Sequence, residues 1–166
     1  MSECMNLKCL LKIFQRSKDF LRSAGWIVCD ANSPRWWDNL RSYEEIVICS
    51  ILVQVSSWDS VKKALINLRK AGLANLRMLS EAGIEEVERL INPVGFRSVK
   101  ARRLVNVARE IERIGGLNGL RKLEDPRRFL LSIDGIGKET ADAIMLFALN
   151  IPTVPVSNYV RSVLNR

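Results

Sequence analysis

Histidine is absent from all 166 residues of the sequence. Its absence excludes the Ser-His and Cys-His pairs that activate nucleophiles in many hydrolases, and it argues against zinc sites of the Cys/His type. The four cysteines fall in the first third of the chain with irregular gaps and no Cys-x-x-Cys spacing: Cys4, Cys9, Cys29 and Cys49. We therefore expect reduced, buried thiols and no metal site.

Long apolar runs are also missing. The first twenty residues, "MSECMNLKCLLKIFQRSKDF", interrupt their apolar positions with lysines, so we expect no secretory signal peptide. No stretch reaches the length of a membrane-spanning helix. The sequence therefore predicts a soluble, cytoplasmic protein that does not act at a membrane.

Acidic residues are in short supply relative to basic ones. Eighteen Asp and Glu face 26 Lys and Arg, which gives a net charge of +8 and an isoelectric point near 9.7. This excess favours anionic partners, with nucleic acid first and a membrane surface second. The hydrophobic content of 48% is enough for a core within one domain, or for two small helical lobes that share a cleft.

Strand patterns are scarce, and apolar residues recur at helical spacing along most of the chain. The sequence predicts an all-α fold with short connections. Helices are expected over residues 7–24, 42–57, 58–71, 80–91, 94–116, 125–133 and 138–149, with a last one from residue 158. The mostly apolar segment 42–57, with Ser42 as its N-cap, is expected to be the central buried helix.

The stretch "IDGIGKETADA" places two glycines around Ile136 immediately before a helix. Gly135 and Gly137 permit a positive φ and put no Cβ in the way of an approaching group, while Lys138 adds positive charge. Such a turn can bind a phosphate through its backbone N–H groups. The alternative is a turn that packs two helices and binds nothing, because two glycines alone are a weak signal.

The longer segment "FLLSIDGIGKETADAIMLFAL" has the form of a helix-hairpin-helix, and it resembles the DNA-binding hairpin of the endonuclease III superfamily of DNA glycosylases. Three other stretches resemble the same family in the same order: "WWDNLRSYEEIVICSILVQVSSWDSVKKALINL", "VGFRSVKARRLVNVAREI" and "PTVPVSNYVRSVLNR". The Trp36-Trp37 pair and "GIGKETADAI" resemble most closely the endonuclease III-related and 3-methyladenine glycosylase branch.

The resemblance implies a two-lobed helical glycosylase fold, truncated at its C-terminus. It implies a glycosylase domain over residues 36–166, with its hairpin at about 125–149, after an N-terminal helix and loop over residues 1–35. The implied partner is double-stranded DNA with a damaged or mismatched base, bound by a monomer associated with the nucleoid. The resemblance assigns DNA binding to Gly135, Ile136, Gly137, Lys138, Thr140 and Gln54. Arg127 and Arg128 stand just before the hairpin, where they suit phosphate contacts, whereas Arg97, Lys100, Arg102 and Arg103 either contact phosphates or form a solvated basic face.

Two positions bear on catalysis. Glu139 stands where relatives with strand-cleaving activity carry a lysine, so the resemblance implies base excision by N-glycosidic hydrolysis without lyase activity. Ser157 stands where relatives carry an aspartate, and a serine has neither the charge nor the basicity of that carboxylate. Glu139 or Asp142 could replace it. Two alternatives stay open: an active glycosylase, or a catalytically inactive, truncated paralogue that only binds DNA.

Three further features have two interpretations each. Gln54 lies where relatives insert a side chain into the gap left by a flipped base, but it could also cap a core helix. Trp36, Trp37 and Trp58 could line a pocket for a cationic alkylated base, or belong to the core. Many relatives carry an iron–sulfur cluster on four closely spaced cysteines, and because this sequence lacks that pattern we expect no cofactor.

Overall fold

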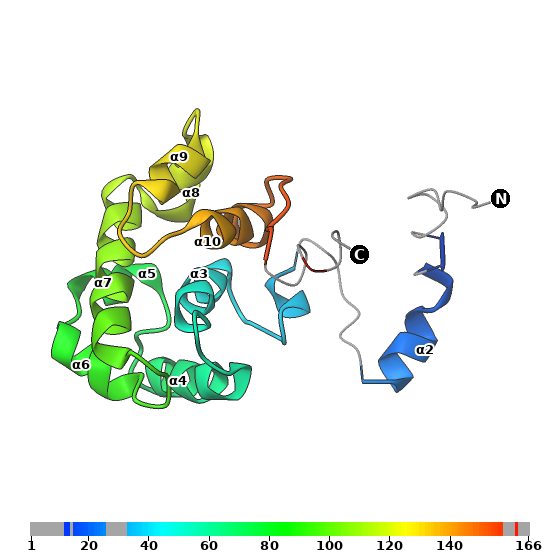
Figure 1. Cartoon of the computed structure of the whole chain (residues 1–166), viewed down its shortest axis with the longest axis horizontal. Coiled ribbons are helices and arrows are strands. Elements are labelled where there is room, and N and C mark those ends of the chain that lie inside the picture. The colour runs from blue at the N-terminus through cyan, green and yellow to red at the C-terminus, as the bar shows by residue number, and fades with distance from the viewer. Residues whose placement is uncertain (1–11, 14, 26–32, 158–161, 163–166) are drawn as a thin grey trace.

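In the computed structural model, the described residues are 12–13, 15–25, 33–157 and 162. Every regular element among them is a helix, which confirms the predicted all-α fold (Figure 1). The start of the helix expected over residues 7–24, and the helix expected from residue 158, lie outside the described residues. No helix in the described part of the chain is both long and apolar enough to cross a bilayer.

The helices follow one another with short connections. Their bounds are α2 (Lys18–Ser23), η1 (Pro34–Trp36), α3 (Tyr43–Leu52), α4 (Trp58–Lys70), α5 (Leu76–Glu81), α6 (Ile84–Leu90), α7 (Arg97–Arg113), α8 (Gly116–Lys122), α9 (Pro126–Leu131), α10 (Lys138–Ala143) and the π-helical turn η2 (Ile144–Ala148) that continues α10. None of the residues of α2 is buried.

The central helix is α3, as the apolar segment predicted. Eight of its ten residues are buried, and the side chain of Ser42 accepts the N–H of Glu45 as an N-cap. Burial of so many apolar side chains stabilises the fold by roughly 2 kcal/mol each. Glu45 is compensated within the core, because Arg69 of α4 donates to both of its carboxylate oxygens at 2.7 and 2.6 Å.

The prediction of one helix over residues 80–91 is wrong. The structure has two short helices there, α5 and α6, because Ala82 and Gly83 adopt extended backbone angles between them. Asn75 caps the start of α5 by accepting the N–H of Met78 at 2.8 Å. Both helices pack against α7, where Leu79 and Val87 are buried.

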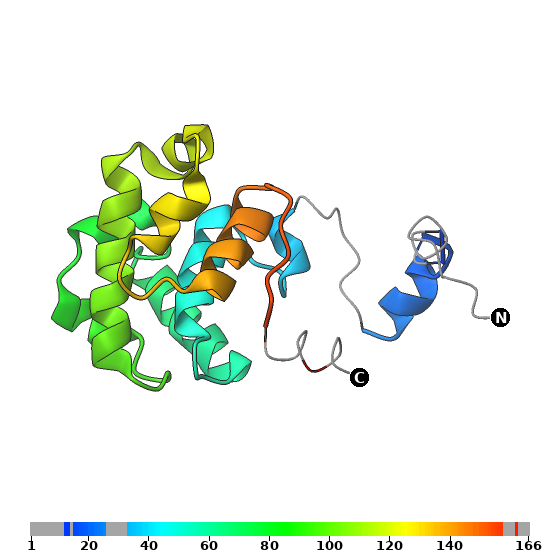
Figure 2. The same cartoon turned by 45° about the horizontal axis from the view of Figure 1, so that its top comes forward.

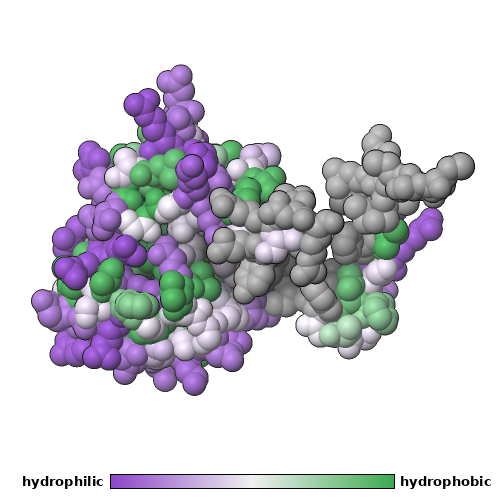
Figure 3. Space-filling view, in the orientation of Figure 1, coloured by the Kyte–Doolittle hydropathy of each residue, from purple (hydrophilic) through white to green (hydrophobic). Residues whose placement is uncertain are grey.

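The long helix α7 connects the helices around α3 with the later helices α8 to α10. It contacts α3, α5 and α6 on one side, and α8 follows it directly. The chain then turns through α9 into α10, which lies beside α3 in both ribbon views (Figures 1 and 2). A hydrophilic surface with scattered apolar patches covers the face seen in Figure 3. The hairpin, α3 and α7 therefore meet in one region.

Candidate nucleic-acid interface

The Gly-Ile-Gly turn joins α9 to α10, where the sequence predicted a hairpin. Asp125 caps α9 by accepting the N–H of Arg128 at 2.8 Å, and Pro126 occupies its first position. The side chains of Ile133 and Ile136 are buried in the core and hold the turn from inside. Ile136 can therefore meet a ligand only through its backbone, while the exposed side chains of Lys138 and Glu139 border the outer face of the turn.

The two glycines of the turn have different roles. Gly135 has φ +90°, and a Cβ built there would overlap Cδ of Arg103 and lie 2.7 Å from its Cγ. Gly137 has φ −87°, and no atom lies within 4 Å of the place its Cβ would take. The first glycine thus makes room for an arginine of α7, and the second leaves the outer face of the turn open to an approaching ligand.

Gln54 ties the first half of the chain to the hairpin. Its side-chain amide donates to the carbonyl of Gly135 at 3.1 Å and to the hydroxyl of Thr140 at 3.2 Å. The sequence offered two interpretations, a side chain inserted into DNA or a cap on its own helix. In the structure, Gln54 hydrogen-bonds to the turn and to the first turn of α10.

A hollow of about 470 Å³ lies between these elements, and we call it the hairpin hollow. Its lining residues are Gln54, Arg103, Gly135, Ile136, Gly137, Lys138, Glu139 and Thr140. Six of the eight residues to which the sequence assigned DNA binding therefore line one cavity. Arg103 was not among them. The sequence offered Arg103 only as one of four basic residues that could contact phosphates or form a solvated face, because nothing in their spacing marks the one that faces the hairpin.

The other two assigned arginines lie on α9. Arg127 forms an ion pair with Asp142, with Nε 2.7 Å from Oδ1, and the neighbouring carboxylate raises the pKa of the guanidinium. Thr153 donates to the same carboxylate at 3.4 Å. Asp142 is therefore buried and paired with both Arg127 and Thr153, whereas Arg128 is exposed.

The two positions relevant to catalysis lie in different segments. Glu139 is exposed in the first turn of α10. Ser157 is half-buried in the extended segment that follows η2. The bond from Thr153 to Asp142 attaches that segment to α10, so the ion pair with Arg127 helps to position the extended segment that carries Ser157.

Two exposed apolar side chains lie on the loop after α3 and on the loop before α7, and the sequence analysis did not name them as site residues. Val55 is 84% exposed with φ 53°, and Phe96 is 70% exposed with φ 56°. Positive φ is strained for β-branched and aromatic residues, and such strain concentrates at functional sites.

A buried lysine joins the loops that carry these two side chains. Lys100, only 3% exposed, donates to the carbonyl of Leu52 and to the hydroxyl of Ser56, both at 2.7 Å. The same hydroxyl accepts the N–H of Gly95 at 3.2 Å. Burial lowers the pKa of Lys100, and the nearby charge of Arg103 lowers it further. Val55 and Phe96 are thus held on neighbouring loops.

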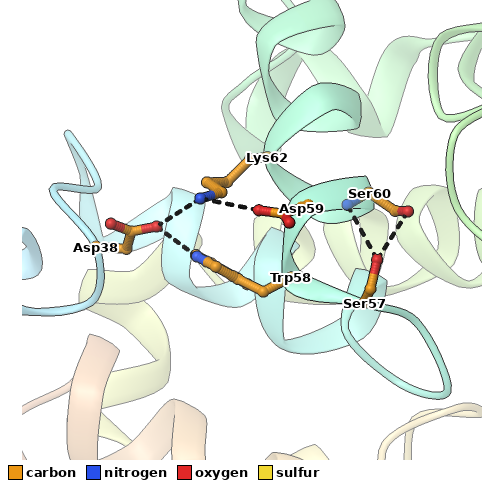
Figure 4. A network of polar contacts seen from close by, with 6 residues as sticks. All are labelled: Asp38, Ser57, Trp58, Asp59, Ser60 and Lys62. Atoms are coloured by element: carbon orange, nitrogen blue, oxygen red, sulfur yellow. Dashed lines mark hydrogen bonds and ion pairs between the residues drawn. The ribbon is translucent and has the colours of Figure 1, made fainter.

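An aromatic cluster lies between η1, α4 and η2. The rings of Trp37 and Trp58 stack with centroids 6.1 Å apart and an interplanar angle of 17°, and Phe147 meets Trp37 edge-on at 5.5 Å. Figure 4 shows the indole N–H of Trp58 and the ammonium of Lys62 both directed at the carboxylate of Asp38. The side chain of Trp36 lies outside the described residues.

Metal ligands do not gather in the part of the chain that the structure describes, where no group of three or more His, Cys, Asp or Glu could hold an ion. Cys49 is buried in α3, and burial raises the pKa of its thiol to about 12. A thiol in such a place is a packing group and does not fit a cluster ligand. The other three cysteines lie outside the described residues.

Comparisons with known proteins agree with this architecture. A protein of Methanocaldococcus jannaschii named as a DNA repair glycosylase is 36% identical over 136 residues, which cover 79% of this chain and 61% of that protein. Endonuclease III of Escherichia coli is 28% identical over 128 residues, covering 77% and 58%. This chain therefore spans about six tenths of the length of these relatives.

A solved structure is also similar, the H. pylori 3-methyladenine DNA glycosylase MagIII bound to 1,N6-ethenoadenine. It superposes with a TM-score of 0.72 at 26% identity, over 94% of this chain and 71% of that one. The model of the HhH-GPD superfamily of base excision DNA repair proteins matches residues 48–166. Since that match takes in most of the chain, including the hairpin, α3 from Ile48 and all of α7, this chain belongs to the HhH-GPD superfamily of base excision DNA repair proteins.

Proposed function

We propose that this protein binds duplex DNA through the hairpin hollow and removes a damaged or mismatched base by hydrolysis of the N-glycosidic bond. The observation that carries the proposal is the open outer face of Gly137 within a cavity that Gln54, Lys138 and Thr140 also line. Backbone N–H groups and a lysine suit a phosphate, and the net charge of +8 favours the polyanion. We expect the protein to act as a monomer, associated with the nucleoid.

The exposed side chains of Val55 and Phe96 suit the deformation of DNA that this function requires. A base that is extruded from the helix leaves a gap, and apolar side chains that enter the stack stabilise the kinked duplex. Val55 lies close to the hairpin hollow, because Gln54 precedes it directly and reaches Gly135. Phe96 is exposed on the neighbouring loop, whose Gly95 N–H donates to the hydroxyl of Ser56. We assign to them the role of wedges.

The aromatic cluster supports alkylated purines as the class of base. A purine that carries an added alkyl group bears positive charge, and such a base binds well to the face of an indole. Trp37 and Trp58 present stacked rings of this kind, with the carboxylate of Asp38 beside them. The similarity to a 3-methyladenine glycosylase points in the same direction.

Hydrolysis breaks the bond between C1′ and the nitrogen of the nucleobase, and a water oxygen bonds to C1′. The proton of that water passes to a proton-accepting side chain or to the departing purine. A carboxylate normally stabilises the sugar cation or takes that proton. Asp142 is unsuited because it is paired with Arg127, which leaves Glu139 as the exposed acid of α10. With Glu139 in place of a lysine, we expect no lyase activity and no cofactor.

Ser157 favours a second candidate function, DNA binding without catalysis. The deciding experiment is single-turnover base excision on duplexes with alkylated purines, uracil or a thymine mismatch, comparing the protein with Ser157→Asp and Glu139→Gln. If the unaltered protein excises the base and Glu139→Gln abolishes this excision, the protein is an active enzyme that uses Glu139. Excision only by Ser157→Asp supports the inactive, DNA-binding alternative. Gly137→Phe should weaken DNA binding in either case, and unchanged binding would refute the hairpin assignment.

A further inference from the structure

Arg103 differs from the other arginines of α7, because its side chain has no hydrogen-bond acceptor among the residues that the structure describes. Its Nε is buried without a hydrogen-bond acceptor among the described residues, and the guanidinium forms no ion pair with a carboxylate of that part of the chain. The other four arginines of α7 each donate to an acceptor in the protein. Arg97 donates to Glu88, Arg102 to the carbonyl of Ser98, Arg109 to that of Ser80, and Arg113 to Glu110. A buried polar group left unsatisfied in a native fold needs an explanation.

The surroundings of Arg103 place it between two hollows. Its aliphatic stem packs on the Cα side of Gly135, where a Cβ would collide with it. The residue lines the hairpin hollow on one side and a second hollow of about 360 Å³, together with Asp134, on the other. The absence of a side chain at Gly135 is thus what lets a residue of α7 reach the hairpin.

The charges of the hairpin hollow depend on Arg103. Its lining residues include two cations, Arg103 and Lys138, and one anion, Glu139. Without Arg103, the charges of Lys138 and Glu139 would cancel, and the cavity would attract a phosphate only through backbone N–H groups. The planar guanidinium also has five donors in a fork that matches two phosphate oxygens.

We propose that Arg103 is the charged ligand of a DNA backbone phosphate held in the hairpin hollow, so that α7 and the hairpin grip the same phosphodiester. The inference rests on the proposed DNA-binding function and adds to it the residue that supplies the charge. The terminal N–H groups of the guanidinium, rather than its buried Nε, donate to the phosphate oxygens, and binding of the phosphate releases a counterion from the duplex.

The test measures binding of a fluorescent duplex by anisotropy over a series of potassium chloride concentrations. Arg103→Met keeps the aliphatic stem against Gly135 and removes the charge, and Arg103→Lys keeps the charge. Arg113→Met is the matched control, because it removes the same unit of net charge from the same helix at a site about 15 Å further along. Thermal unfolding of each variant reports whether the fold is intact.

We expect Arg103→Met to weaken binding about tenfold at low salt and to lower the slope of log K against log salt by about 1. Arg103→Lys should retain the slope of the unaltered protein, and Arg113→Met should leave both affinity and slope nearly unchanged. An unchanged slope in Arg103→Met overturns the inference, as does equal weakening by Arg113→Met. A lower melting temperature with an unchanged slope also overturns it, since Arg103 would then be a packing residue only.

Gly137→Phe separates this inference from the proposed function. If Gly137→Phe weakens binding while Arg103→Met does not, the hairpin binds DNA and only the role of Arg103 fails. If Gly137→Phe leaves binding unchanged, the hairpin assignment itself fails, and the role of Arg103 fails with it.

Discussion

The side-chain amide of Gln54 donates to the carbonyl of Gly135, 3.1 Å away and 81 residues later in the sequence. The same amide reaches Thr140, so one side chain from the loop after α3 holds both the turn of the hairpin and the start of α10. The loop that carries Val55 and the hairpin are thereby one unit, and displacement of either must disturb the other.

Gln54→Ala should lower the free energy of unfolding by about 1 kcal/mol and should also weaken DNA binding, because it removes both hydrogen bonds and frees the turn. Urea denaturation and anisotropy measure the two effects. Asn67→Ala is the control, since Asn67 also donates a side-chain amide to a distant carbonyl, that of Leu90. Equal weakening of DNA binding by both variants would show that the effect reflects stability alone.

The contact between Arg103 and Gly135 leads to a second prediction. Gly135→Ala should destabilise the fold by about 2 kcal/mol, because the new Cβ meets the arginine stem and φ is +90°. In an Arg103→Ala background the cost should fall to about 1 kcal/mol, since only the backbone strain is left. Gly137→Ala should change stability by less than about 0.5 kcal/mol. A double-mutant cycle in urea measures the coupling, and additive values would contradict the contact.

Asp142 gives a third prediction, which separates an anchoring role from a catalytic one. Asp142→Asn should lower the free energy of unfolding, because it removes the negative charge that faces Arg127 and weakens the bond to Thr153. The excision rate of the fraction that stays folded should remain within a few-fold of the original. A loss of excision by a hundredfold with the fold intact would instead identify Asp142 as the catalytic carboxylate.

Much of the fold could be predicted from the sequence. Ser42 with two glutamates after it marked the start of α3, and Pro126 marked that of α9, because capping signals are local. The helix α8 could not be predicted, since its seven residues include two glycines and glycine disfavours helices. Burial of Leu120 against the rest of the core compensates, and that packing is not visible in a local pattern.

The candidate site was predicted in part for the same reason. Gly135, Gly137, Lys138 and Thr140 belong to one short motif, and the structure gathers them with Gln54 around the hairpin hollow. The position of Arg103 beside Gly135 depends on which face of α7 packs against the hairpin, and tertiary packing decides that. The left-handed backbone of Val55 was equally unpredictable, because a β-branched residue rarely adopts it.

Glu45 leads to a fourth prediction, on pH. Burial alone would raise the pKa of Glu45, but the hydrogen bonds from Arg69 and from the N–H of Arg41 outweigh it and hold that pKa below its ordinary value of 4.5. The unfolded chain therefore binds a proton at a higher pH than the folded protein does. The stability from this group is complete above pH 4.5 and is lost as the pH falls through the lower, folded pKa.

Glu45→Gln should remove that acid-side loss and cost about 3 kcal/mol near neutral pH. Glu44→Gln is the control on the same helix, because burial raises the pKa of Glu44 and the charge of Glu112 adds to the rise. Its charge opposes folding near neutral pH, so its removal should leave stability equal or higher. Urea midpoints between pH 3 and 7 measure both, and a decline on the acid side that Glu45→Gln leaves intact would contradict the assignment.

Phe96 and Val55 allow a final prediction in which stability and function move in opposite directions. Glycine adopts positive φ without strain, so Phe96→Gly and Val55→Gly should each raise the free energy of unfolding by about 1 kcal/mol. Both should weaken binding to a duplex with an abasic or damaged site, because the apolar wedge is gone. Phe96→Leu keeps an apolar side chain on the same backbone and should retain most of the affinity. If the glycine variants gain stability and bind the damaged duplex as tightly as before, the strain in these loops does not serve DNA deformation.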